Sequence, residues 1–189
     1  RLSAYVVEEI IICHHSHTDV GYTHEQPTLW DIQQRGIEAA IEYCDPEATE
    51  PHAMRWTIET TMPLLDWLAD ASPDRIEQLQ ELEAAGTVEI AAMAHHGTPL
   101  FDPEAYEEVL RPVERLRAEY GFEITHAMNC DVNGQNWPLV ESLLDAGIET
   151  YEMKINEHFG GAPMQRPNLF HWEGASGETI PTLNNYHYG

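Results

Sequence analysis

Histidines and a carboxylate gather in residues 12–26, which read ICHHSHTDVGYTHEQ. His17 and Asp19 are two positions apart, and in an extended chain such residues point to the same side. One imidazole nitrogen and one carboxylate oxygen could then bind the same cation, a donor mixture that suits Zn²⁺ with an open coordination position. The pattern His-x-Asp is also common by chance, so an ordinary polar turn is the alternative interpretation.

The other histidines of this stretch carry weaker signals. His14 and His15 could orient the metal ligands from a second layer, or they could be ordinary residues at the end of a strand. His24 is interpreted as a loop residue. Gly21 permits the chain to turn close to the site.

Further candidate residues follow the ends of later predicted strands. In α/β folds the active site forms at the carboxyl ends of the strands, so these positions are informative. Asp131 follows one such strand and could supply a third metal ligand. Second-layer or substrate contacts are predicted, with ordinary strand-end roles as the alternative, for His15, Glu59, His95, His96 and His187.

Apolar spacing predicts the elements that must position these residues. Strands are predicted at 5–13, 55–60, 88–94, 124–130 and 149–155, with two more within 168–174 and 178–189. Helices are predicted at 27–44, 62–71, 72–86, 102–121 and 136–147. Ser72 and Asp102 should begin two helices, Asn136 should cap the last, and Pro112 should kink or split the helix that contains it.

This alternation of strands and helices indicates an α/β fold with a largely parallel sheet. The pattern alone does not separate a barrel from an open sheet. A complete barrel of eight units takes about 250 residues, so the strands predicted in these 189 residues suggest a partial β/α barrel. The sequence has no GxGxxG or Walker-type loop, which leaves nucleotide binding with little support.

The composition is strongly acidic, with 33 Asp and Glu residues and a formal net charge of −24. Lys154 is the only lysine. Such a charge repels nucleic acid and anionic membranes, so neither is a predicted partner. Acidic residues spread over helix faces fit a folded protein adapted to high salt, and a halophilic source is predicted.

The sequence shows no signal peptide and no membrane-spanning run, and a cytoplasmic location is predicted. The chain begins with Arg, which fits a processed or excised segment. The three cysteines, Cys13, Cys44 and Cys130, lack the spacing of a disulfide framework or a zinc site. They are interpreted as small buried hydrophobic residues.

Two motifs resemble glycoside hydrolase family 38, the retaining α-mannosidases. They are HSHTDVGYT at 15–23 and NCDVNGQNWPLVESLLDAGI at 129–148. The resemblance spans about residues 10 to 150. It implies that His17 and Asp19 bind Zn²⁺, with another divalent metal as the alternative, and that Asp131 is both a ligand and the catalytic nucleophile. It also implies a seven-stranded β/α barrel that hydrolyses α-linked sugars.

The chain departs from family 38 around the second motif. Val132, Asn133 and Gln135 stand where the family has Pro, an aromatic residue and His, and AHHGTP replaces a Trp-containing strand end. The sugar and the linkage therefore stay open. The family's other metal-binding His and its acid/base Asp are expected beyond residue 189. Residues 1–189 are thus predicted to be the N-terminal part of a single barrel domain, inactive by itself.

Two other functions stay open. A metal-dependent carbohydrate deacetylase would need an H-x-x-x-H ligand pair, and no two histidines of this chain are four positions apart. A non-catalytic module that binds metal or sugar could use the same ligands without an acid/base residue. The predicted partner is a carbohydrate in each case, and no oligomeric state is predicted.

Overall fold

A computed structural model describes residues 12, 14–46, 54–98, 100–132, 134–154 and 168–185 of the protein. The predicted strand at 5–13 lies outside these ranges, except for Ile12. Strands and helices alternate as predicted, and the α/β class is confirmed. Their order is β1 (His14–His15), α1 (Gln26–Cys44), β2 (Trp56–Ile58), α2 (Thr61–Asp70), α3 (Pro73–Ala84), β3 (Val88–Ile90), α4 (Pro103–Tyr120), β4 (His126–Cys130), α5 (Pro138–Asp145), β5 (Thr150–Lys154), β6 (Leu169–Glu173) and β7 (Thr179–Asn185).

The strands form one row in the order β1-β2-β3-β4-β5-β7-β6. The first three are parallel to one another, as are β4, β5 and β7, and a parallel bridge between Ala91 and His126 joins the two groups. β6 pairs with β7 in antiparallel fashion. Within the described residues, β1 and β6 are each paired on one side only. The largely parallel sheet is therefore confirmed, while a closed seven-stranded barrel stays a prediction.

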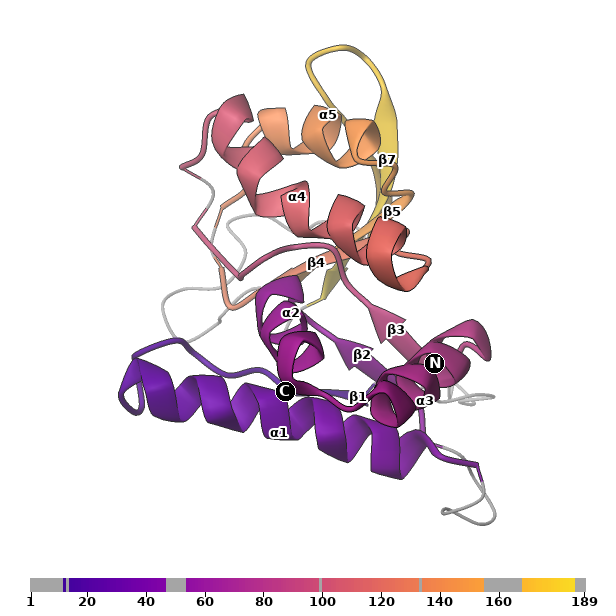
Figure 1. Ribbon diagram of the computed structural model, residues 1–189. Coiled ribbons are helices and arrows are strands. Elements are labelled where there is room, and N and C mark those ends of the chain that lie inside the picture. Colours follow the sequence, from indigo (N-terminus) through magenta and orange to yellow (C-terminus); the bar gives the residue numbers. More distant parts are fainter. Residues whose placement is uncertain are drawn as a thin grey trace, which may run out of the picture.

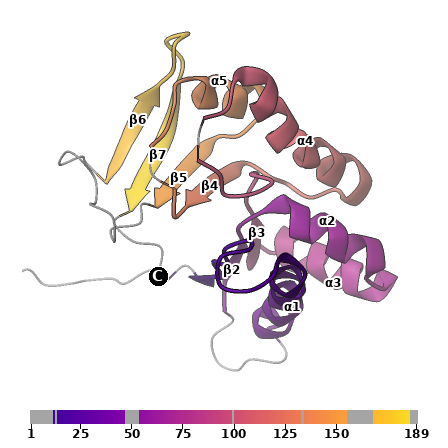
Figure 2. The same ribbon diagram turned by 90° about the vertical axis from the view of Figure 1, so that its left-hand side faces the viewer.

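The sheet is strongly curved, and the five helices of the described residues lie on its outer side (Figure 1 and Figure 2). β1 and β5 are four positions apart in the row, which corresponds to about 19 Å in a flat sheet. Nζ of Lys154 nevertheless lies 3.0 Å from Nε2 of His15. Two side chains can meet across this span only if the sheet bends, so the face away from the helices is concave.

The main hydrophobic core lies between the sheet and the helices. Each helix buries one apolar face, as Ile37 and Ile41 of α1 illustrate. A second cluster is separate from this core and consists of Ala91, Met128 and Cys130. Alternate residues of a strand point to opposite faces, so this small cluster belongs to the concave face. Glu152 and Lys154 of β5 alternate with the core residues Tyr151 and Met153 and so lie on this face as well.

Two helix starts agree with the predicted caps. Oγ of Ser72 accepts a hydrogen bond from the backbone N–H of Arg75 at 3.4 Å, at the start of α3. Oδ1 of Asp102 accepts one from the backbone N–H of Ala105 at 2.9 Å, at the start of α4. Each side chain satisfies a helix N–H that has no partner within its helix.

Pro112 does not split its helix, since α4 is continuous over Pro103–Tyr120, and of the two predicted alternatives the kink stays a prediction. Another prediction about helices differs from the structure. Asn136 does not cap α5, whose N-cap is Trp137. The Asn136 carboxamide instead accepts from the Tyr106 hydroxyl at 2.5 Å and donates to the carbonyl of Phe101 at 2.9 Å. A tertiary contact thus replaces the local one.

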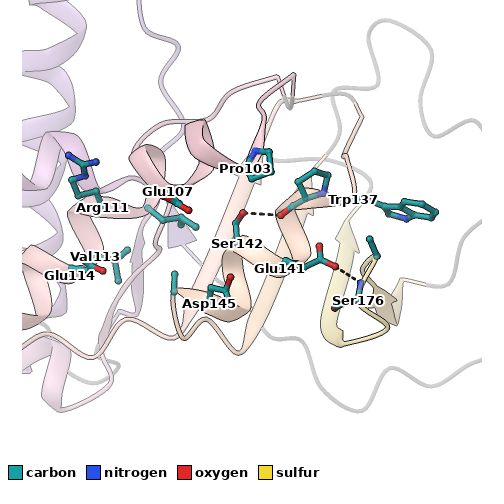
Figure 3. A pocket seen from close by; sticks show the side chains of 14 residues that line it. Pro103, Glu107, Arg111, Val113, Glu114, Trp137, Glu141, Ser142, Asp145 and Ser176 are labelled. Carbon is teal, nitrogen blue, oxygen red and sulfur yellow. Dashed lines mark hydrogen bonds between the residues drawn. The ribbon is translucent and has the colours of Figure 1, made fainter.

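A groove of about 940 Å³ lies on the helical side, between α4, α5 and the turn that joins β6 to β7 (Figure 3). Trp137 is 64% exposed at this groove, and Glu141 accepts a hydrogen bond from the backbone N–H of Ser176 at 2.8 Å. The described residues that line it include no histidine or cysteine. The candidate chemistry therefore lies elsewhere. No helix in the described ranges has the length and apolar character that crossing a membrane requires.

Candidate active site

Glu59 follows β2 and gathers three histidines around its carboxylate. It accepts N–H groups from His15, from His17 at 3.2 Å and from His96 at 2.7 Å. His15 belongs to β1, His17 lies just beyond it, and His96 follows β3, so the neighbouring order of these strands brings the residues together. Glu59 is only 6% exposed. The structure thus places these four predicted strand-end residues in one cluster.

His17 also faces two other carboxylates. Its Nε2 lies 3.7 Å from Oδ1 of Asp19 and 3.9 Å from Oδ2 of Asp131. Asp131 follows β4, which adjoins β3 in the row. The three residues offer ligand atoms that all lie within 4.8 Å of one another. The residues predicted as metal ligands are therefore close enough to share one cation.

Asp131 has an unusual backbone conformation for a residue other than glycine. Its φ is 56°, in the left-handed region that crowds Cβ against the backbone. Strain of this kind clusters at functional sites. Its Oδ1 is buried and has no hydrogen-bond partner among the described residues. A buried carboxylate oxygen without a donor is costly, and a bound cation would satisfy it.

The loop after β3 is held against β4 in a way that orients His96. The Asn129 carboxamide both accepts from the N–H and donates to the carbonyl of Gly97, each at 3.2 Å. The backbone N–H of Cys130 donates to Nδ1 of His96 at 3.1 Å. Because Nδ1 accepts, the proton of a neutral His96 ring lies on Nε2, the nitrogen that faces Glu59.

The charges of this cluster act on one another. Burial would raise the pKa of Glu59, but hydrogen bonds from the three histidines outweigh burial and hold that pKa well below its usual range. Burial would lower the pKa of His17, but the nearby carboxylates of Glu59, Asp19 and Asp131 outweigh it and raise that pKa. Glu59 is therefore ionised at neutral pH and has no proton to give as a general acid.

Within the described ranges, two groups of side chains could hold a metal ion: His17, Asp19 and Asp131, or His17, Glu59, His96 and Cys130. Burial and the charge of Glu59 raise the pKa of the Cys130 thiol, which disfavours the thiolate that binds metals. Nε2 of His96 carries a proton, and Glu59 already accepts three hydrogen bonds. The chemistry of the donors therefore fits the first group better.

Other predicted residues lie away from the cluster. His95 is exposed, and its ring centroid lies 6.0 Å from that of Trp30. Nδ1 of His14 lies 3.2 Å from the carbonyl oxygen of Arg55 and is positioned to donate to it. His187 lies outside the described residues.

Lys154 is a member of the cluster that the sequence interpretation missed. It is the last residue of β5, is 5% exposed, and contacts both His15 and Glu152, the latter at 3.6 Å. A signal was present in the sequence, because the chain's only lysine lies next to the last residue of a predicted strand.

A family comparison establishes the relationship of the chain. The model of the "Glycosyl hydrolases family 38 N-terminal domain" matches residues 8–189. The chain belongs to glycosyl hydrolase family 38. The resemblance inferred from two motifs is thereby confirmed, and the match extends it to the end of the chain. Curated protein sequences gave no match.

Solved structures share the fold of this family 38 chain. An α-mannosidase from Enterococcus faecalis V583 is 15% identical, with a TM-score of 0.68 over 90% of the chain and 19% of that protein. A family 38 protein from Enterococcus faecalis is 12% identical, with a TM-score of 0.62 over 91% of the chain and 18% of that protein. A 4-α-glucanotransferase from Thermococcus litoralis is 21% identical, with a TM-score of 0.58 over 91% and 27%. The chain therefore spans a minor part of each of these proteins.

Proposed function

We propose that this domain is part of a metal-dependent glycoside hydrolase that cleaves α-linked sugars through a covalent intermediate on Asp131. The observation that carries the proposal is the meeting of His17 and Asp19, which follow β1, with Asp131, which follows β4, in a chain that belongs to a glycosyl hydrolase family. The structural likeness to an α-mannosidase makes an α-mannoside the first substrate to test. The family match favours this function over a carbohydrate deacetylase.

His17, Asp19 and Asp131 would hold the metal, and their mixture of nitrogen and oxygen donors suits Zn²⁺. When bound, the metal supplies Lewis-acid stabilisation of charge at sugar oxygens. Glu59 would orient His17, because its carboxylate accepts the N–H at Nδ1 and thereby turns Nε2 toward the two aspartates. Carboxylates commonly support a ligating histidine in this way.

Asp131 would act as the nucleophile of a retaining hydrolase. One of its carboxylate oxygens bonds to the anomeric carbon as the glycosidic C–O bond breaks, and the leaving oxygen takes a proton from a general acid. Water then hydrolyses the glycosyl ester and restores the carboxylate. Glu59 does not suit the role of the acid because its hydrogen bonds keep it ionised, so another residue must donate that proton.

A trapping experiment tests the nucleophile. A fluorinated α-mannosyl substrate, which slows breakdown of the covalent intermediate, is incubated with the intact protein in high salt with Zn²⁺. Mass spectrometry of the peptides should place the label on Asp131 and find none in Asp131→Asn. Asp145→Asn, at an exposed carboxylate of α5, is the matched control and should label normally. A label on another carboxylate would rule out the assignment.

A second experiment tests the metal ligands independently of turnover. Crystals soaked with zinc should show an anomalous-scattering peak between His17, Asp19 and Asp131. A peak beside His96 and Cys130 instead would favour the other group of donors. Crystals without any peak near His17 would remove the metal from the proposal.

A further inference from the structure

Lys154 combines three properties that call for a physical explanation. It is the only lysine in a chain of net charge −24, it is 5% exposed, and it ends β5 on the concave face beside the candidate active site. Removing an ammonium group from water is costly unless the group is paired and hydrogen-bonded. A lysine whose task was solubility would lie at the surface, so its burial indicates a task within the cluster.

The contacts of Lys154 fix the proton of one histidine. Its Nζ lies 3.0 Å from Nε2 of His15, and an ammonium group has donors but no acceptor. Nε2 of His15 must therefore accept, which leaves the ring proton on Nδ1. That nitrogen faces Oε1 of Glu59, which accepts the proton's hydrogen bond. Lys154, His15 and Glu59 thus form a directed chain of donors that ends on a carboxylate.

The same logic applies to the rest of the cluster. His96 receives the N–H of Cys130 at Nδ1 and so donates from Nε2 to Glu59. Glu59 also contacts Nδ1 of His17. The ionised Glu59 carboxylate has no proton to donate, so it accepts the N–H at Nδ1 of His17. This hydrogen bond directs Nε2 of His17 toward Asp131.

We propose that Lys154 is a positioning residue that fixes the Nδ1–H tautomer of His15 and, through Glu59, the orientation of His17. The second half of this statement rests on the proposed role of His17 as a metal ligand, whereas the first half does not. Glu152, 3.6 Å from Nζ, supplies the partner charge that a buried ammonium needs. Lys154 touches neither of the aspartates proposed as ligands in the described contacts and acts through His15 alone.

The first test measures the tautomer of His15 in the metal-free full chain. Long-range ¹H–¹⁵N NMR spectra separate protonated from unprotonated ring nitrogens, and His15→Gln assigns the signal. We expect a protonated Nδ1 and an unprotonated Nε2. A protonated Nε2 in the unaltered chain would overturn the proposal. This test needs no variant of Lys154, so it remains decisive even if such a variant fails to fold.

The second test compares Lys154→Met with Lys154→Arg. Methionine fills the space without a donor, so His15 should shift toward the Nε2–H tautomer or a mixture, whereas arginine should keep Nδ1–H. Zn²⁺ affinity measured by calorimetry should fall by about tenfold in Lys154→Met, the lower end for an outer-layer partner, and recover in Lys154→Arg. An unchanged tautomer, or an unchanged affinity with an altered tautomer, would overturn the positioning role.

These readouts separate the two proposals. A chain that binds no Zn²⁺ would count against the proposed function, while the His15 tautomer would still decide whether Lys154 fixes it. A chain that binds Zn²⁺ with the wrong His15 tautomer would count against Lys154 alone. His171→Gln, at an exposed histidine of β6, is the control that should change neither quantity.

Discussion

The two ends of the sheet use their polar side chains differently. At the amino ends of the strands, side chains bond to the backbone of the loops. Arg117 donates to the carbonyl oxygens of Ala146 at 2.7 Å, of Gly147 at 3.3 Å and of Ile124. Glu83 accepts a loop N–H at 3.0 Å. These contacts satisfy backbone groups that loops would otherwise leave unpaired.

At the carboxyl ends, side chains mainly bond to one another. Glu59 collects three imidazole N–H groups, and Lys154 donates to one of those rings. The arrangement leaves His17 facing the carboxylates of Asp19 and Asp131 at distances too long for hydrogen bonds. At the amino ends, the side chains named above are hydrogen-bonded to loop backbone. At the carboxyl ends, His17, Asp19 and Asp131 instead place potential metal-ligand atoms around a common point. This difference supports the proposal of a site at the carboxyl ends of the strands.

The largest expected effect is on metal binding at the carboxyl end. Glu59→Gln replaces a carboxylate that accepts three N–H groups with an amide that must turn a donor toward one of them. We expect the Zn²⁺ affinity to fall by about 100-fold, the upper end for an outer-layer carboxylate. Glu83→Gln at the amino end is the matched control, and calorimetry should show no change. Equal losses in both variants would erase the distinction between the ends.

The next effect concerns stability at the amino end. Arg117→Met keeps most of the side-chain stem but removes a guanidinium that donates to three carbonyls. Unfolding in urea should show a loss of about 2 kcal/mol, roughly 30-fold in the unfolding equilibrium, because three backbone carbonyls, two of them in part-buried hydrogen bonds, lose a charged donor. Zn²⁺ affinity should stay within about twofold. A large loss of affinity with little loss of stability would show that the amino end also controls the site.

A smaller effect follows from protonation of His17. The pKa of His17 is raised above 6.5, so protons compete with the metal, and Zn²⁺ affinity should fall by about tenfold per pH unit below that pKa. The stability of the metal-free domain depends on pH in the opposite direction. The nearby carboxylates stabilise protonated His17 in the folded domain. This contribution to stability is fully present below pH 6.5 and is lost as the pH rises through the raised pKa of His17. Calorimetry across pH tests the first part, and urea unfolding with chelator tests the second. An affinity independent of pH would contradict the assignment of His17.

The smallest expected effect is on stability, at a residue that lies on the carboxyl side of the sheet but bonds to backbone. Asp102 begins the helix that follows β3, on the carboxyl side of the sheet, but it bonds to a backbone N–H. Asp102→Ala should therefore behave like an amino-end variant and cost about 1 kcal/mol of stability. Metal affinity should not change. If affinity falls instead, position at the carboxyl end matters more than the type of partner.

The sequence by itself determined the local elements and the positions of the candidate ligands. Apolar spacing placed the helices, and the strands from β2 onward, within a few residues of their observed bounds, while the strand predicted at 5–13 stays a prediction. The H-x-D pair and Asp131 stood out at strand ends. Local signals suffice here because helix and strand periods and caps depend on near neighbours in the chain.

Tertiary structure decided which of these residues meet. Lys154 and His15 are 139 positions apart and touch only because the sheet curves. Asn136 does not cap α5 but bonds to Tyr106. Of the sequence neighbours His95 and His96, only His96 bonds to Glu59. These outcomes depend on strand order, sheet curvature and loop packing. No short stretch of sequence contains this information. The residue pattern could therefore identify the strand ends, but it could not show which of their side chains contact one another.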